Sequence, residues 1–337
     1  MSAPSSSTPS ASPAAPIPVP RVAIRSWLLP VGVALALAVL PLVISSYQQD
    51  LVLKVLIYAI FALSLELLVG VTGLVSLGHA AFLGIGAYVT VLAAGDTGGS
   101  IATVAPLAVL AAAGYALFVG ALSLRTKGVY FIMVTLAFAQ MAYFVFHDTK
   151  IAGGSDGLFL YAKPSWGALT LDSKQHLYYV VVGTLVATYA LLALLMRSRF
   201  GHALAGIRVN EQRMRAAGFA TFGYKLAAFV IAGALAGLAG FLLAVKDGAV
   251  NPELLSWHES GAVLLMLILG GIGSLRGAVI GAIAFTLLKE FFQLESLLGP
   301  LASHWQMTLG FTIIAFVALL PQGLIGLRSR WTGAAHG

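Results

Sequence analysis

The stretch LAAFVIAGALAGLAGFLLAV, residues 226–245, consists of apolar and small side chains and contains no charged residue. As an α-helix it would be about 30 Å long, which matches the hydrocarbon thickness of a membrane. Lys225 and Lys246 stand directly at its two ends. The stretch therefore predicts a membrane-spanning helix, and it indicates that lipid is the solvent for much of the chain.

The overall composition extends this prediction to the whole sequence. Of the 337 residues, 59% are hydrophobic and only 9% are charged, whereas ordinary globular domains contain about 25% charged residues. The chain has no cysteine, which excludes disulfides and thiolate metal sites within it. We therefore expect an all-α polytopic membrane protein.

The two ends of the chain differ from this apolar centre. Residues 1–20 are mostly serine, alanine and proline without charge, and such a segment is predicted to be a disordered cytoplasmic tail. The first apolar run begins only after Arg21 and Arg25, which favours a retained membrane helix over a cleaved signal peptide. Residues 21–330 are then expected to form a single transmembrane domain, and residues 331–337 a short C-terminal tail.

About ten apolar runs have a length suited to crossing the membrane. The eighth and ninth runs are short and rich in glycine, so these two are expected to be broken or re-entrant. The runs cover residues 27–45, 51–70, 73–94, 101–122, 129–146, 177–196, 226–245, 259–274, 277–292 and 306–326.

The charged residues segregate when the runs are assigned alternately to the two sides of a membrane. With the N-terminus inside, all 11 arginines fall in inner segments, and ten of the 12 acidic residues fall in outer segments. Cytoplasmic loops carry an excess of Lys and Arg, so this pattern predicts that both termini are cytoplasmic. It also accounts for the net charge of +7 without nucleic acid as a partner.

Two segments between the runs are long enough to have a function of their own. The outer segment, 147–176, is either a docking or gating surface or a connector that closes the bundle. The inner segment, 197–225, contains the charged sequence IRVNEQRMRAAGF at residues 207–219.

The inner segment is predicted to contain one amphipathic helix from Ala203 to Ala217. On such a helix Arg208, Glu211 and Arg215 lie on one face, so that Glu211 is able to pair with both arginines. Gly218 follows at the position where a residue with positive φ commonly ends a helix. The residues alone leave two interpretations open: a helix that lies on anionic lipid, or a rigid lever that a soluble partner grips.

Ionisable residues inside membrane spans are costly and are functional candidates. Glu66 lies in the second predicted span and His79 at the start of the third, where the two are possible partners of each other. Residues from Ser76, SLGHAAFLGIGA, are echoed by SLRGAVIGAIA from Ser274, and glycine-interrupted segments in two halves of a transporter often mark its substrate site. Glu66, Ser76 and His79 are therefore candidate pathway residues.

Several catalytic motifs are absent from the sequence. It contains no phosphate-binding G-x-x-x-x-G-K-[ST] loop, no H-E-x-x-H and no G-x-S-x-G. A many-span bundle without an energy source of its own is typical of a transport subunit that a partner drives. We therefore expect that the chain is not an enzyme.

Several segments together resemble the permeases of ABC-type branched-chain amino acid importers, specifically the LivM-type subunit. The similar segments span about residues 55–290, which is most of the chain. The similar segments are LLVGVTGLVSLGHAAFLGIGAYV (67–89), KGVYFIMVTLAFAQM (127–141), GGSDGL (153–158), GHALAGIRVNEQRMRAAGF (201–219), KLAAFVIAGALAGLAGFLLA (225–244) and LLMLILGGIGSLRGAVIGA (264–282).

This resemblance implies a set of partners in a bacterial inner membrane. They are a second, LivH-like permease, two ABC ATPase subunits that bind ATP, and an extracytoplasmic substrate-binding protein. It implies alternating access driven through a coupling helix at 203–218, and no cofactor in this subunit. The residues expected to contact the ATPase are Arg208, Asn210, Glu211, Arg213, Arg215 and Gly218.

Two alternatives to this function stay open. The first is a permease of the same family that transports urea or short amides. The second is a self-sufficient secondary transporter or channel. At the positions of Glu66 and Ala278 the family usually has Asn and Pro, and small residues usually stand where Arg213 and Arg215 lie.

Overall fold

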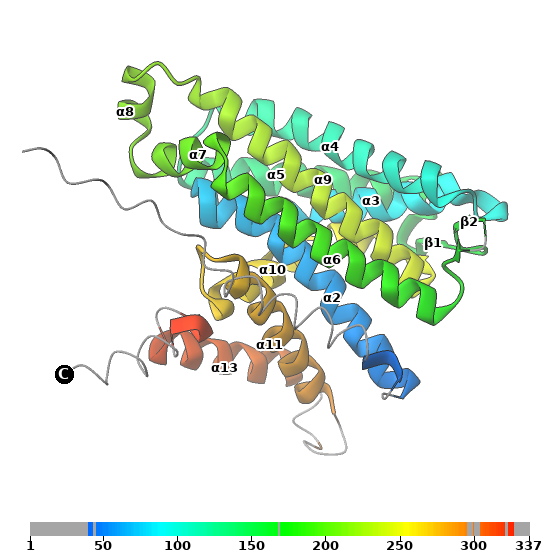
Figure 1. Cartoon of the computed structure of the whole chain (residues 1–337). Helices are drawn as coiled ribbons and strands as arrows, with labels where there is room; N and C mark the ends of the chain where they lie inside the picture. Colours follow the sequence, from blue (N-terminus) through cyan, green and yellow to red (C-terminus); the bar gives the residue numbers. More distant parts are fainter. Residues whose placement is uncertain are drawn as a thin grey trace, which may run out of the picture.

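The computed structural model describes residues 40–42, 45–167, 169–294, 299, 304–320 and 323–326. Within these residues the chain is almost entirely helical (Figure 1). The all-α fold class is therefore confirmed. Both predicted tails, and nearly all of the first predicted span at 27–45, lie outside the described residues.

The described helices coincide with the other nine predicted spans. Seven of them are long and apolar enough to cross a membrane, or up to eight if α10 and α11 together form one span. The bounds of the nine helices are α2 (Ser46–Glu66), α3 (His79–Ala94), α4 (Ile101–Ser123), α5 (Val129–Asp148), α6 (Lys174–Arg197), α9 (Thr221–Asp247), α10 (Trp257–Gly270), α11 (Leu275–Gln293) and α13 (Trp305–Leu319).

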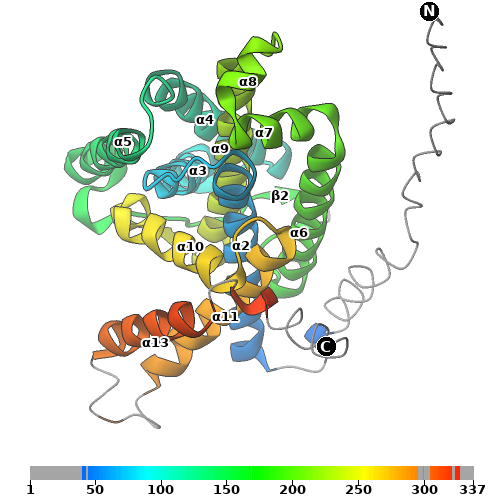
Figure 2. The same cartoon turned by 90° about the vertical axis from the view of Figure 1, so that its left-hand side faces the viewer.

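Helices α2 and α9 form the centre of the bundle. In their most apolar 18-residue windows, 89% and 78% of the residues are buried, whereas the corresponding share is 22% in both α4 and α5. Figure 2 shows α2 and α9 lying between α3, α5 and α10 on one side and α6 on the other. The outer helices expose large apolar side chains such as Leu110 and Phe144, as expected for a surface that faces lipid or another membrane subunit.

Small residues allow the central helices to approach one another closely. A Cβ atom on Gly86 of α3 would collide with the backbone of Gly237 on α9, and one on Gly240 would collide with the carbonyl of Leu83. The glycines of the LAAFVIAGALAGLAGFLLAV stretch are thus packing residues, because only hydrogen fits between the two backbones.

Helices α10 and α11 form a sharply broken pair. They are bent by 115° at the turn between them, which confirms that the eighth and ninth predicted runs are short and broken or re-entrant. The pair packs tightly at its turn because Gly270 faces the backbone of Gly277, and Gly281 faces that of Met266.

The connections between helices lie at two ends of the bundle. One end carries four two-residue strands: β1 (Leu158–Phe159) pairs antiparallel with β4 (Ala249–Val250), and β2 (Ser165–Trp166) with β3 (Leu169–Thr170). The β1–β4 pair ties the predicted outer segment 147–176 to the end of α9. The segment 197–225 lies at the opposite end (Figure 1). Which end faces the cytoplasm stays a prediction.

Candidate functional site

The segment between α6 and α9 folds as two short helices rather than one. They are α7 (Arg199–Val209) and α8 (Glu211–Ala216), and the chain breaks at Asn210, whose φ of −156° is extended. The prediction of one continuous helix from Ala203 to Ala217 is therefore wrong. The Asn210 side chain accepts a 2.9 Å hydrogen bond from the amide of Arg213, so it caps α8.

The break at Asn210 has a signal in the sequence that the periodicity of the apolar residues conceals. Asn is among the preferred residues at helix N-termini, and Glu211 follows it in the first turn, where a negative charge is favourable. The pair Asn210–Glu211 indicates a new helix start. Gly218 ends α8 with a φ of +88°, which confirms the predicted helix end.

Glu211 connects α8 to the beginning of α9. Its carboxylate accepts hydrogen bonds from Lys225 at 2.6 Å, from Arg215 at 2.6 Å and from Thr221 at 3.1 Å. The pairing of Glu211 with Arg215 was predicted. The second cation is Lys225 on α9, however, and the predicted pairing with Arg208 is wrong.

These contacts fix the charge state of Glu211. Partial burial would raise its pKa, but the hydrogen bond and charge of Lys225, together with the hydrogen bonds of Arg215 and Thr221, lower it to about 2. Glu211 is therefore ionised at every physiological pH, and it holds three groups from α8 and α9 together.

Helix α8 is attached to the bundle only along one side. Ala203, Leu204 and Ile207 of α7 are buried, and Met214 of α8 packs against Gly206. The residues facing away, including Arg213, are exposed. The two helices thus form a protrusion whose exposed residues include both charged side chains and Val209. We call it the loop knob (residues 199–218; Figure 2).

Arg208 joins the loop knob to the end of α2. Its guanidinium donates a hydrogen bond to the carbonyl of Gly70. Gly70 belongs to η2 (Leu67–Thr72), a π-helical turn that continues α2 and ends at Gly73 with a φ of +74°. Turns of this type are rare in proteins overall, and many of those that occur lie at functional sites.

Glu66 lies one helical turn before Gly70, at the end of α2. It connects this end of α2 to the break between α10 and α11. It is fully buried, and its Oε1 accepts a 2.8 Å hydrogen bond from the amide of Gly273. Gly70 leaves room for this carboxylate, because a Cβ atom there would collide with it. Arg208, Gly70, Glu66 and Gly273 therefore form a continuous chain of contacts from the loop knob to the broken pair.

The other two candidate pathway residues lie in packed surroundings. His79 is fully buried, forms a 2.8 Å hydrogen bond with Ser64, and lies between the rings of Phe61 and Phe82. Its partner is thus Ser64, and the possible pairing with Glu66 is not formed. Ser76 is buried and accepts a hydrogen bond from the amide of Gly78.

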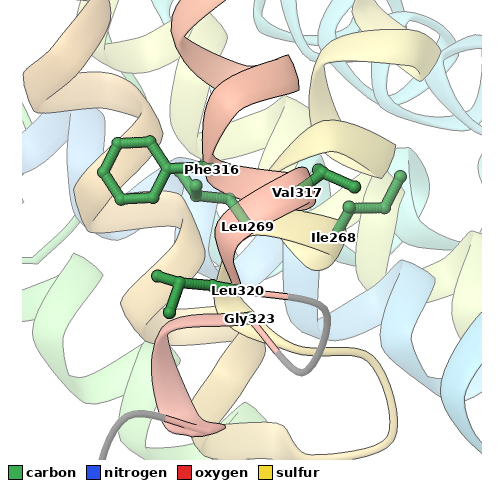
Figure 3. A pocket seen from close by; sticks show the side chains of 6 residues that line it. All are labelled: Ile268, Leu269, Phe316, Val317, Leu320 and Gly323. Carbon is green, nitrogen blue, oxygen red and sulfur yellow. The ribbon is translucent and has the colours of Figure 1, made fainter.

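The described residues that line a small cavity between α10 and α13 are all apolar or glycine (Figure 3). Ile268 and Leu269 of α10 face Phe316 and Val317 of α13 across it. Such walls offer nothing to orient a polar ligand. Within the described residues no group of three or more His, Cys, Asp or Glu side chains is placed to hold a metal ion.

Comparison with known proteins gives a consistent result. A family model described as the permease component of branched-chain amino acid transport systems matches residues 48–318. The chain is 30% identical to the high-affinity branched-chain amino acid transport permease LivM of Salmonella typhimurium over 309 residues, which cover 85% of this chain and 71% of the relative.

Two further relatives are more distant. The permease BraD of Pseudomonas aeruginosa is 25% identical, and the permease LivH of Escherichia coli is 23% identical, each over 80% of this chain and 91% of the relative. Both carry the same description of high-affinity branched-chain amino acid transport. No solved structure gives a significant match.

Proposed function

This chain belongs to the permease components of branched-chain amino acid transport systems, and from that premise we propose that it imports aliphatic amino acids through alternating access driven by ATPase partners. As a multi-pass membrane permease of an ABC importer, it has a function that requires a source of energy. The proposal places that source in two ATPase subunits, and it includes a second permease and an extracytoplasmic binding protein in a bacterial inner membrane.

The loop knob is proposed as the element that the ATPases move. The observation that carries this proposal is the contact of Arg208 with Gly70 and of Glu66 with Gly273. Through these contacts a displacement of α7 would reach both the end of α2 and the α10–α11 turn. A helix that merely lies on lipid needs no such connection, since its apolar face would be buried in the membrane.

The exposed part of the loop knob would form the contact with the ATPase. Asn210 and Gly218 shape α8, and Glu211 and Arg215 hold it on α9. Arg213 is exposed and would contact the partner. The predicted orientation agrees with this assignment: the loop knob lies at the arginine-rich end of the bundle, and arginine-rich loops face the cytoplasm, where ATP is available.

Purification in mild detergent tests the proposed assembly. The tagged full-length chain, extracted from its native membrane, should co-elute with two ATPase subunits and a second permease. Substrate binding by the associated binding protein separates the remaining alternative within the family. Tight binding of leucine supports the proposal, whereas tight binding of urea without binding of leucine would contradict the proposed substrate.

A further inference from the structure

One face of α5 is left uncovered by the rest of the described bundle, at whose edge this helix lies (Figure 2). The buried residues of α5 recur at spacings of four, four and three, so they share a single face. They are Phe131, Thr135, Ala139 and Ala142. The residues of the opposite face, which we call the open face of α5, are all at least partly exposed. They are Met133, Ala137, Gln140 and Phe144.

Gln140 is the polar residue of the open face, and it lies deep within its span. It is 11 residues from Val129 and eight from Asp148, the two ends of α5. At a rise of about 1.5 Å per residue, these separations correspond to roughly 16 Å and roughly 12 Å along the helix axis. The side chain of Gln140 is too short to cover either distance, so its amide stays within the hydrocarbon depth of the membrane.

The amide of Gln140 requires a hydrogen-bond partner that the described residues do not supply. It has two N–H donors and a carbonyl acceptor, and no described residue hydrogen-bonds to it. Thr135 on the same helix is different, because its hydroxyl donates a 2.9 Å hydrogen bond to the carbonyl of Ile132. An amide without a partner in hydrocarbon is costly, and glutamine side chains in membrane helices hydrogen-bond across to neighbouring helices. We therefore expect a polar group opposite Gln140.

Two possible neighbours of the open face cannot provide this polar group from their side chains or tails. Lipid tails carry no hydrogen-bonding atom. The first predicted membrane run of this chain lies outside the described residues, and positions 28–44 within it, LLPVGVALALAVLPLVI, contain no polar side chain. A separate membrane subunit remains, and the proposed assembly already includes one in the second permease.

The exposed face of α6, on the other side of the bundle (Figure 2), has a different character. Val186, Ala187 and Leu191 are exposed near the middle of this helix, and all three are apolar. Thr184 of the same helix donates its hydroxyl hydrogen to the carbonyl of Val180. Lipid tails are a suitable neighbour for such a surface, since they are as apolar as leucine. Helix α6 therefore serves as a reference for a face that lipid can cover.

We propose that the open face of α5 is the contact surface for a membrane helix of the second permease, and that a polar side chain of that helix hydrogen-bonds to Gln140. Ala137, one turn before Gln140, lets the partner helix approach closely because its side chain is small. Met133 and Phe144 lie at the two ends of this contact and pack against apolar side chains of the partner. The inference rests on the proposed function, since the second permease is part of that proposal.

Photo-crosslinking in the assembled importer tests the contact surface. The photoreactive residue p-benzoylphenylalanine replaces Phe144 on the open face or, as the matched control, Leu191 on α6. Irradiation of native membranes should join the chain labelled at position 144 to the second permease, and mass spectrometry identifies the adduct. The chain labelled at position 191 should form no such adduct. If position 144 forms an adduct only with lipid, with residues 27–45 or with a second copy of this chain, or forms none, the inference is overturned.

The proposed hydrogen bond has a separate test. Gln140→Leu removes the amide and keeps a side chain of similar size. The affinity for the second permease, measured by dilution in mild detergent, should fall about threefold or more, which is the size expected for a hydrogen bond between membrane helices. Met141→Leu is the matched control, because Met141 is the adjacent exposed residue and has no amide in its side chain. Both variants should leave the thermal stability of the full-length chain, purified by itself, unchanged.

The surface, the hydrogen bond and the proposed assembly can fail separately. Unchanged affinity in Gln140→Leu, together with an adduct at position 144, would support the surface and overturn the hydrogen bond. If no second permease co-elutes with the wild-type chain, the proposed assembly fails and the inference fails with it. If a second permease co-elutes but position 144 forms no adduct with it, only the inference is overturned.

Discussion

Glu66 and Gly273 are 207 positions apart in the sequence, yet the amide of Gly273 donates a 2.8 Å hydrogen bond to Oε1 of Glu66. This contact fixes the turn between α10 and α11 against the end of α2. Arg208 binds the same end of α2 through the carbonyl of Gly70. The end of α2 therefore connects the loop knob, through Arg208, to the broken helix pair, through Glu66.

The first prediction concerns the acceptor at position 66. Glu66→Ala removes it, and with it the hydrogen bond from the amide of Gly273, which should cost about 0.5–1.5 kcal/mol. We expect a lower thermal stability in detergent and a loss of leucine uptake. Glu66→Gln keeps an acceptor oxygen at the same distance and should retain both properties. An alanine variant as stable and active as the glutamine variant would show that this contact has no role.

The second prediction concerns the charge of Glu211. Glu211→Arg would place a third cation beside Arg215 and Lys225, and their repulsion should detach α8 from α9. Uptake should fall below one tenth of the wild-type rate, while the amount of protein in the membrane stays the same. Gln212→Arg is the control, because it adds a positive charge at the neighbouring exposed position. Equal loss in both variants would argue against a specific role of the Glu211 cluster.

The third prediction concerns pH. Because the folded-state pKa of Glu211 is about 2 and its ordinary value is about 4.3, its contribution to stability is fully present above the ordinary value. It is lost as the pH falls from about 4 towards 2. A fluorophore on Gln212→Cys should report release of α8 in that range. Adding Glu211→Gln should remove this transition; a transition that persists unchanged would assign it to another group.

The fourth prediction concerns the cap at Asn210. Asn210→Ala should destabilise α8 by about 1 kcal/mol, so that amide hydrogens in Glu211–Ala216 exchange roughly five times faster. Asn210→Asp, which also accepts the hydrogen bond from Arg213, should exchange at close to the wild-type rate. If alanine and aspartate give the same rates, the cap does not stabilise the break.

The membrane helices were predictable because their signal is local. An uninterrupted apolar run such as 226–245 is sufficient to indicate a span, and helix α9 extends it by only a few residues at each end. The weak eighth and ninth runs, with their glycines, likewise indicated the broken pair. Each of these features depends on the composition of neighbouring residues in the chain.

The contacts of the candidate site were less predictable because their partners are distant in the sequence. Helix periodicity correctly paired Glu211 with Arg215, four residues away. It gave Arg208 as the second partner because it assumed a continuous helix, and it had no means of finding Lys225, 14 residues away on α9. The partners of Arg208 and Glu66 depend in the same way on how separate helices pack.

The central claim is that this permease transports amino acids only when ATPase partners drive it. The most direct measurement is leucine flux into liposomes that contain either the complete importer or this chain alone. The account predicts binding-protein-dependent uptake by the complete importer that requires ATP, and no uptake by the chain alone. Leucine flux by the chain alone, driven by an ion gradient and independent of ATP, would contradict it.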